Sequence, residues 1–101
     1  MPKREFPALV AEVLDEKKII INRGSDDQIK KGDRFLIYEL TKEIMDPETH
    51  ESLGRLEVSK GTGIAIQVQE KMTVIHSDSD RNGVIVPFSS IPKRGDRVKF
   101  I

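Results

Sequence analysis

The chain has 101 residues, with 17 basic and 17 acidic side chains and no cysteine. This length supports one domain with one core, so we predict that residues 1–101 form a single domain. A zero net charge provides no overall field that would attract nucleic acid or an anionic membrane. The absence of cysteine excludes disulfides and thiol chemistry, and it removes the commonest structural ligands of zinc.

The N-terminal segment contains no apolar stretch long enough for export or for a membrane span, so we expect a soluble cytoplasmic protein without membrane contact. Residues 6–14 (FPALVAEVL) predict a first strand, although residues 8–18 also have helical spacing. A polar turn at residues 15–18 precedes three isoleucines at 19–21. Consecutive β-branched residues are stiff and favour a second strand.

Residues 25–32 (SDDQIKKG) predict one short helical turn. Ser25 is a candidate cap, while Lys30 and Lys31 suit the negative end of the turn and Gly32 suits a left-handed stop. We expect Ile29 to fill one end of the core. The apolar run at residues 35–40 (FLIYEL) then predicts a strand.

A protruding hairpin is predicted around the sequence IMDPETHESL at residues 44–53. Asp46 can accept hydrogen bonds from backbone amides, and Pro47 presets φ for the turn. We expect the apolar residues of this hairpin to form a contact surface, and they are Ile44, Met45, Pro47 and Leu53.

The second half of the chain repeats short apolar segments between turns. KGTG at residues 60–63 predicts a bulge, residues 64–68 alternate at the period of a strand, and residues 72–77 predict another strand. Asn82-Gly83 marks an exposed turn. Together these segments predict an all-β fold, a small β-barrel of about six to eight strands with one helical turn and a protruding hairpin.

One phrase occurs twice, as KKGDRF at residues 30–35 and as KRGDRV at residues 93–98. In each copy a glycine permits an unusual backbone angle, and an aspartate can accept backbone hydrogen bonds where the chain enters a strand. We therefore predict that two corners of one barrel use the same residues. The structural residues are Gly32, Asp33, Gly95 and Asp96, and Arg34 and Arg97 begin equivalent strands.

Residues 20–98 resemble the C-terminal β-domain of flagellar assembly protein T. The resemblance lies in INRGSDDQIKKGDRFLIYEL, in the hairpin IMDPETHESLGRLEV and in the later GTGIAIQVQEKMTVI and GDRV. Gly-Asp corners also occur in small barrels of the cradle-loop kind, some of which bind nucleic acid. Gln28 and His50 of this chain occupy positions at which the flagellar family usually has glycine. The resemblance implies a domain for assembly and interaction, with no catalytic residues to transfer.

Several short motifs admit a chemical interpretation and a structural one. His50 and His76 have no spacing typical of a metal site, HSDSD at residues 76–80 places neighbouring side chains on opposite faces of a strand, and KGTG lacks the helix that follows a phosphate loop. We therefore predict no enzyme activity, no metal and no cofactor.

Charge is unevenly distributed along the chain. Residues 43–57 contain five acidic side chains and one basic one, whereas residues 81–101 contain five basic side chains and one acidic one. Opposite ends of this kind can dock head to tail in a homo-oligomer, or they can simply keep the barrel soluble. We predict a protein interaction module whose partner is unknown. The alternative is a nucleic-acid-binding barrel that uses a surface Phe88 and the basic residues Lys30, Lys31, Arg34, Lys93, Arg94 and Arg97.

Overall fold

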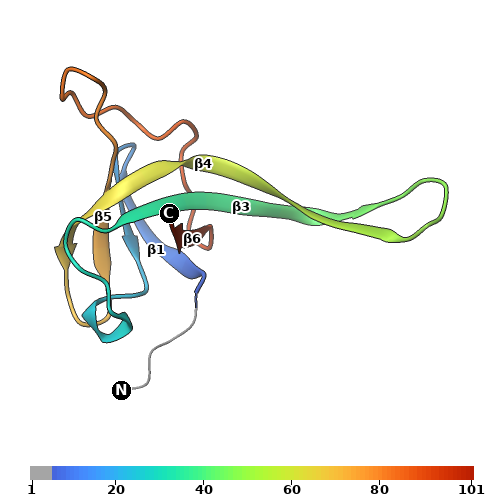
Figure 1. The fold of residues 1–101 in the computed structure, drawn as a ribbon, viewed down its shortest axis with the longest axis horizontal. Helices are drawn as coiled ribbons and strands as arrows, with labels where there is room; N and C mark the ends of the chain where they lie inside the picture. Colours follow the sequence, from blue (N-terminus) through green and yellow to red (C-terminus); the bar gives the residue numbers. More distant parts are fainter. Residues whose placement is uncertain (1–5) are drawn as a thin grey trace.

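The computed structural model describes residues 6–101, in which six strands and one 3₁₀ turn are the regular elements. They are β1 (Ala8–Asp15), β2 (Lys18–Ile21), η1 (Ser25–Asp27), β3 (Arg34–Met45), β4 (Ser52–Val68), β5 (Thr73–Ser77) and β6 (Arg97–Phe100). All neighbouring strands are antiparallel and form a closed ring in the order β1-β2-β5-β4-β3-β6 (Figure 1). The predicted all-β class and the single helical turn are confirmed.

The first segment is a strand and not a helix. β1 begins at Ala8, two residues later than predicted, and Ala8 and Val10 are buried while Leu9 points outward. This alternation is the period of a strand with one face on the core. The isoleucines of β2 pair with β1 on one side and with β5 on the other, so this short strand is closed in on both edges.

Apolar side chains, most of them aliphatic, fill the ring. The buried cluster consists of Ala8, Val10, Ile19, Ile21, Ile29, Phe35, Ile37, Ala65, Ile75, Phe88 and Val98. Ile29 is 3% exposed, as expected of a residue that fills the end of a core. Because this cluster draws on every strand of the ring, the described residues share one core.

The ring consists of two equivalent halves. In both the β1–β2 hairpin and the β4–β5 hairpin, the first strand has residues that are skipped between paired positions, Ala11 and Leu14 in β1 and Ile66 in β4. In each half a basic-Gly-Asp-Arg turn follows and leads into a strand, β3 or β6. One half comprises β1, β2 and β3, and the other comprises β4, β5 and β6. The halves are joined by four strand pairs, β1–β6, β2–β5, β3–β4 and β3–β6.

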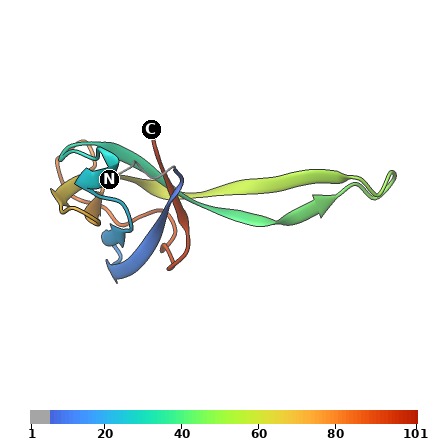
Figure 2. The same ribbon diagram turned by 90° about the horizontal axis from the view of Figure 1, so that it is seen from below.

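A long two-stranded arm extends from the ring (Figures 1 and 2). β6 pairs with β3 only from Phe35 to Tyr38, and β5 pairs with β4 only from Gly63 to Val68. Residues 40–57, called the arm below, therefore pair only with each other. The radius of gyration of 15.2 Å exceeds the ~13 Å typical of a compact chain of this length, as an extended arm requires. The protruding hairpin is confirmed.

Two local predictions are wrong. Ser25 does not cap the helical turn, because Gly24 is the N-cap residue and the carboxylate of Asp27 accepts a hydrogen bond from the Gly24 amide. Gly32 does not end that turn either. The turn ends at Gln28, which adopts a left-handed φ of 67°, and Gly32 belongs to the separate corner that follows.

Candidate functional site

The first corner is a tight turn before β3. Gly32 has a φ of +96°, its amide donates to the Ala65 carbonyl at 2.9 Å, and the Asp33 amide donates to the Lys30 carbonyl at 3.0 Å. The Asp33 carboxylate accepts a hydrogen bond of 2.8 Å from the Lys30 amide. The glycine thus provides the backbone angle, and the aspartate closes the turn on itself.

The second corner has the same geometry before β6. Gly95 has a φ of +90°, its amide donates to the Val10 carbonyl at 2.9 Å, and the Asp96 amide donates to the Lys93 carbonyl at 3.0 Å. The Asp96 carboxylate accepts a hydrogen bond of 2.7 Å from the Lys93 amide. These contacts account for the repeated phrase, since each half of the ring needs the same turn to enter its strand.

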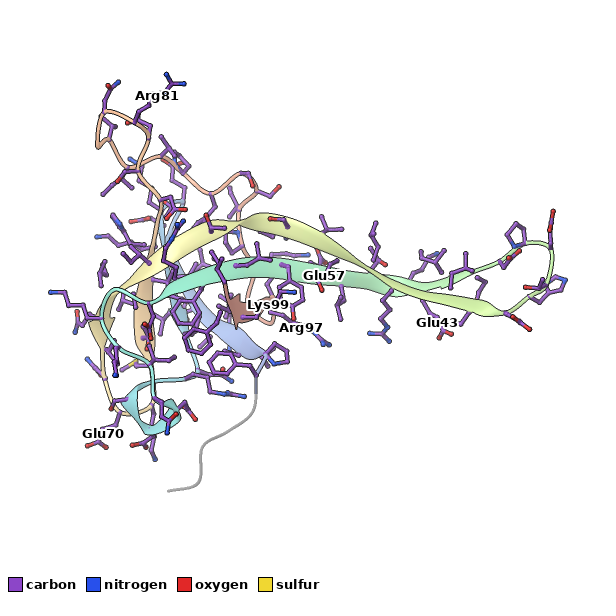
Figure 3. The ribbon with its side chains drawn as sticks, viewed as in Figure 1. Glu43, Glu57, Glu70, Arg81, Arg97 and Lys99 are labelled. Atoms are coloured by element: carbon purple, nitrogen blue, oxygen red, sulfur yellow. The ribbon has the colours of Figure 1, made fainter. Side chains whose placement is uncertain are left out.

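The two corners lie at opposite ends of the β3–β6 pair. The strands are antiparallel, with Phe35 opposite Phe100 and Tyr38 opposite Arg97, so their starting residues lie at opposite ends. Arg81, another basic residue of the C-terminal segment, lies in a distant loop (Figure 3). The basic residues proposed for nucleic acid are therefore divided between two places, Lys30, Lys31 and Arg34 at the first corner and Lys93, Arg94 and Arg97 at the second.

At the first corner, the arginine is neutralised. Arg34 forms an ion pair of 2.6 Å with Asp78, whose carboxylate also accepts a hydrogen bond from Thr62. Lys30 and Lys31 are exposed to solvent. This corner therefore presents two exposed lysines and one arginine that is already paired.

At the second corner, a buried lysine neutralises the carboxylates. Lys60 is 7% exposed, and its Nζ lies 3.2 Å from Asp96 Oδ2 and 3.3 Å from Glu39 Oε2. Lys93 Nζ reaches Glu39 Oε1 at 3.1 Å. The hydrogen bonds from Lys93 and Lys60 lower the pKa of Glu39, and the hydrogen bond to Glu39 raises the pKa of Lys93. Both carboxylates are thus engaged by ammonium groups.

A polar pocket of about 320 Å³ lies between the second corner and the base of the arm. We call it the elbow pocket, and it is lined by Glu39, Leu40, Arg55, Lys93, Arg94, Gly95, Asp96 and Arg97. Arg94 donates through Nε to the Ala11 carbonyl at 3.0 Å. Among residues 6–101, the side chains of Arg55 and Arg97 have no hydrogen-bond or ion-pair partner. Figure 3 shows Arg97 and Lys99 at the base of the arm, with Glu43 farther out.

The arm presents apolar side chains to solvent. Ile44 is 40% exposed, Met45 51%, Leu53 65% and Leu56 61%. Ile44 pairs across the ribbon with Gly54, which has no side chain to cover it. These two residues, Leu53, Leu56 and the one charged residue Arg55 line an open, mainly apolar depression. The predicted contact residues Ile44, Met45 and Leu53 therefore lie on the arm and are accessible.

The arm tip, residues 46–51, is polar. Asp46 Oδ1 accepts a hydrogen bond of 2.7 Å from the Glu48 amide, as the sequence predicts for an Asp-Pro turn. Glu48 and Glu51 are exposed, as is Pro47. His50 has a left-handed φ of 61°. The tip therefore carries free carboxylates at the far end of the molecule (Figure 1).

The prediction that Phe88 lies on the surface is wrong. Phe88 is 6% exposed and belongs to the core cluster. A Cβ atom at Gly61 would lie only 3.0 Å from Cδ1 of the Phe88 ring, so the glycine leaves room for the ring. Gly61 adjoins Lys60, the extra residue of a bulge in β4, which was predicted for KGTG. The signal was present in that motif, because a glycine in a strand often marks a close approach.

The other candidate motifs take part in structural contacts. Ser77 is buried and its hydroxyl donates to the Val86 carbonyl, while Asp78 is occupied by Arg34 and Thr62. Within residues 6–101, no group of three histidine, aspartate or glutamate side chains is arranged to hold a metal ion. No helix in this part of the chain is long and apolar enough to cross a membrane.

The chain was compared with models of known protein families and with curated protein sequences, and neither comparison finds a match.

Proposed function

We propose that this chain is a non-catalytic protein-interaction module, in which the ring acts as a small β-barrel scaffold and the arm is the docking element. The single observation that carries the proposal is the group of solvent-exposed apolar side chains on the arm. This function agrees with the resemblance to an assembly domain.

A free ribbon of this kind gains stability when a partner covers it. An isolated pair of strands is marginally stable in water, and the arm has only itself for pairing. Leu53 and Leu56 are still more than half exposed, and covering them would contribute about 1–2 kcal/mol each. A partner that covers the apolar depression thus supplies the packing that the ring supplies elsewhere.

The test is affinity capture of a protein partner. Wild type and two matched variants of the chain serve as the bait. The arm variant, Leu53→Ser with Leu56→Ser, removes the apolar surface. The control, Val84→Ser with Ile91→Ser, removes two apolar side chains that are 59% and 67% exposed outside the arm. We expect about a 100-fold loss of affinity for the arm variant, corresponding to ~3 kcal/mol, and no change for the control. Equal capture by both variants would contradict the proposal.

The same experiment addresses phosphate binding. Nucleic acid capture weakens steeply as salt rises and disappears with nuclease, whereas a contact with an apolar centre depends little on either. The division of basic residues between two corners argues against one strong phosphate-binding patch. If capture depends on Lys30 and Lys31 and is lost with nuclease, the chain binds nucleic acid and the interaction proposal is wrong.

A further inference from the structure

The elbow pocket has an excess of positive charge. Four cationic side chains and two carboxylates line it, and the buried Lys60 contacts both carboxylates from behind. The side chains of Arg55 and Arg97 have no partner within residues 6–101, and Arg94 uses only its Nε. Guanidinium groups bind carboxylates through paired, charge-assisted hydrogen bonds. The ligand chemistry of this pocket is therefore an acidic segment.

The arm tip of the same chain has matching chemistry. It contains the exposed carboxylates of Glu48 and Glu51 within a turn held by Asp46. The tip lies at the far end of the arm, whereas the elbow pocket lies at its base (Figures 1 and 3). A tip therefore cannot enter the elbow pocket of its own chain.

We propose that the arm tip of one copy binds in the elbow pocket of a second copy, with Glu48 and Glu51 on the guanidinium groups of Arg55, Arg94 and Arg97. This inference rests on the proposed role of the arm as a docking element and names a second copy of the chain as its partner. Each copy has one tip and one pocket, so the contact is head to tail and generates open chains or closed rings.

The first corner offers no equivalent pocket to the tip. Its arginine is engaged by Asp78, and Lys30 and Lys31 are exposed side chains. At the second corner, ion pairs from Lys60 and Lys93 occupy the carboxylates and leave the arginines available. The structure thus favours docking at one corner only.

The test uses two variants that disable opposite ends of the contact. The tip variant is Glu48→Gln with Glu51→Gln, and the elbow variant is Arg55→Gln with Arg97→Gln, since neutral substitutions create no new complementary pair of charges. In sedimentation velocity at low salt, we expect wild type to associate with rising concentration and each variant to associate at least 100-fold more weakly. An equimolar mixture retains one intact tip and one intact pocket, so it should form a 1:1 dimer that grows no further.

A matched control and two outcomes complete the test. Lys30→Gln with Lys31→Gln makes the same charge change as the elbow variant, but at the first corner, and should leave association unchanged. Circular dichroism verifies the folding of every variant. A wild type that stays monomeric, or a mixture that forms no dimer, would overturn the inference. If arm-dependent capture of another protein persists in that case, the proposed function stands and only the self-association is wrong.

Discussion

The two Gly-Asp corners of this ring have the same backbone and different surroundings. In both, the glycine has a φ near +90° and the aspartate accepts a hydrogen bond from the basic residue three positions earlier. Around the first corner, Arg34 is paired with Asp78. Around the second, Asp96 contacts a buried lysine and Arg97 faces an open pocket beneath the arm.

This difference shows how one structural solution acquires two roles. The repeated phrase determines a turn, because its hydrogen bonds lie within the phrase and to one neighbouring strand. The role of the arginine depends on segments elsewhere in the chain, Asp78 in one case and the base of the arm in the other. A repeat in sequence thus predicts a repeated backbone but not a repeated site.

The largest expected difference between the corners concerns their aspartates. Asp96→Ala removes the turn hydrogen bond and one partner of the buried Lys60, so we expect a loss of about 3 kcal/mol in the free energy of unfolding. Asp33→Ala removes only the turn hydrogen bond and should cost about 1 kcal/mol. Urea unfolding measures both. Equal losses would show that Lys60 does not depend on Asp96.

The glycines should behave alike. Alanine at Gly32 or Gly95 meets no neighbouring atom within 4 Å, so the cost arises from the left-handed backbone alone. We expect each substitution to lower the free energy of unfolding by about 1–2 kcal/mol, with nearly equal values. Thermal or urea unfolding of the two variants measures this, and a clear inequality would contradict the shared backbone.

The arginines should separate stability from association. Arg34→Ala breaks an ion pair whose arginine side chain is 56% exposed, and it should cost no more than about 1 kcal/mol without changing association. Arg97→Ala should leave stability nearly unchanged and weaken self-association about 10-fold. Unfolding and sedimentation measurements on the same samples test this pair. An association defect in the Arg34 variant would show that the tip docks at the first corner, which contradicts the proposal.

The smallest effect is expected at Gln28, which ends the helical turn before the first corner. Its φ of 67° favours glycine, so Gln28→Gly should raise the free energy of unfolding by about 0.5 kcal/mol. The gain is small because glycine also increases the entropy of the unfolded chain. A decrease in the urea midpoint would show that contacts of the Gln28 side chain outweigh the backbone strain.

Much of the fold was predictable from local patterns. Alternating and β-branched residues predicted the strands, Asp-Pro predicted the arm tip, and the repeated phrase predicted the corners. Gln28 and His50, the positions where the resembling family has glycine, are the two non-glycine residues among 6–101 with positive φ. The family relationship itself remains a prediction, since a backbone angle does not establish kinship.

The remaining features depended on long-range contacts. Phe88 lies in a segment without strand pattern, and its burial depends on Gly61, far away in sequence. From the sequence alone, Lys60 resembles an ordinary surface lysine. Only the folded chain places it beside Glu39 and Asp96. The elbow pocket likewise combines β3, β4 and the second corner. Local sequence patterns do not predict such contacts between segments that lie far apart in the chain.

Disulfide trapping tests most directly whether the arm tip docks at the second corner alone. The chain has no cysteine, so introduced pairs report only on the chosen contact. Thr49→Cys with Leu40→Cys places thiols at the tip and in the elbow pocket; Thr49→Cys with Lys31→Cys is the matched pair at the first corner. After mild oxidation, we predict a ladder of covalent multimers for the elbow pair and not for the control. If both cysteine pairs give only monomers, or if both give covalent multimers to the same extent, the account is contradicted.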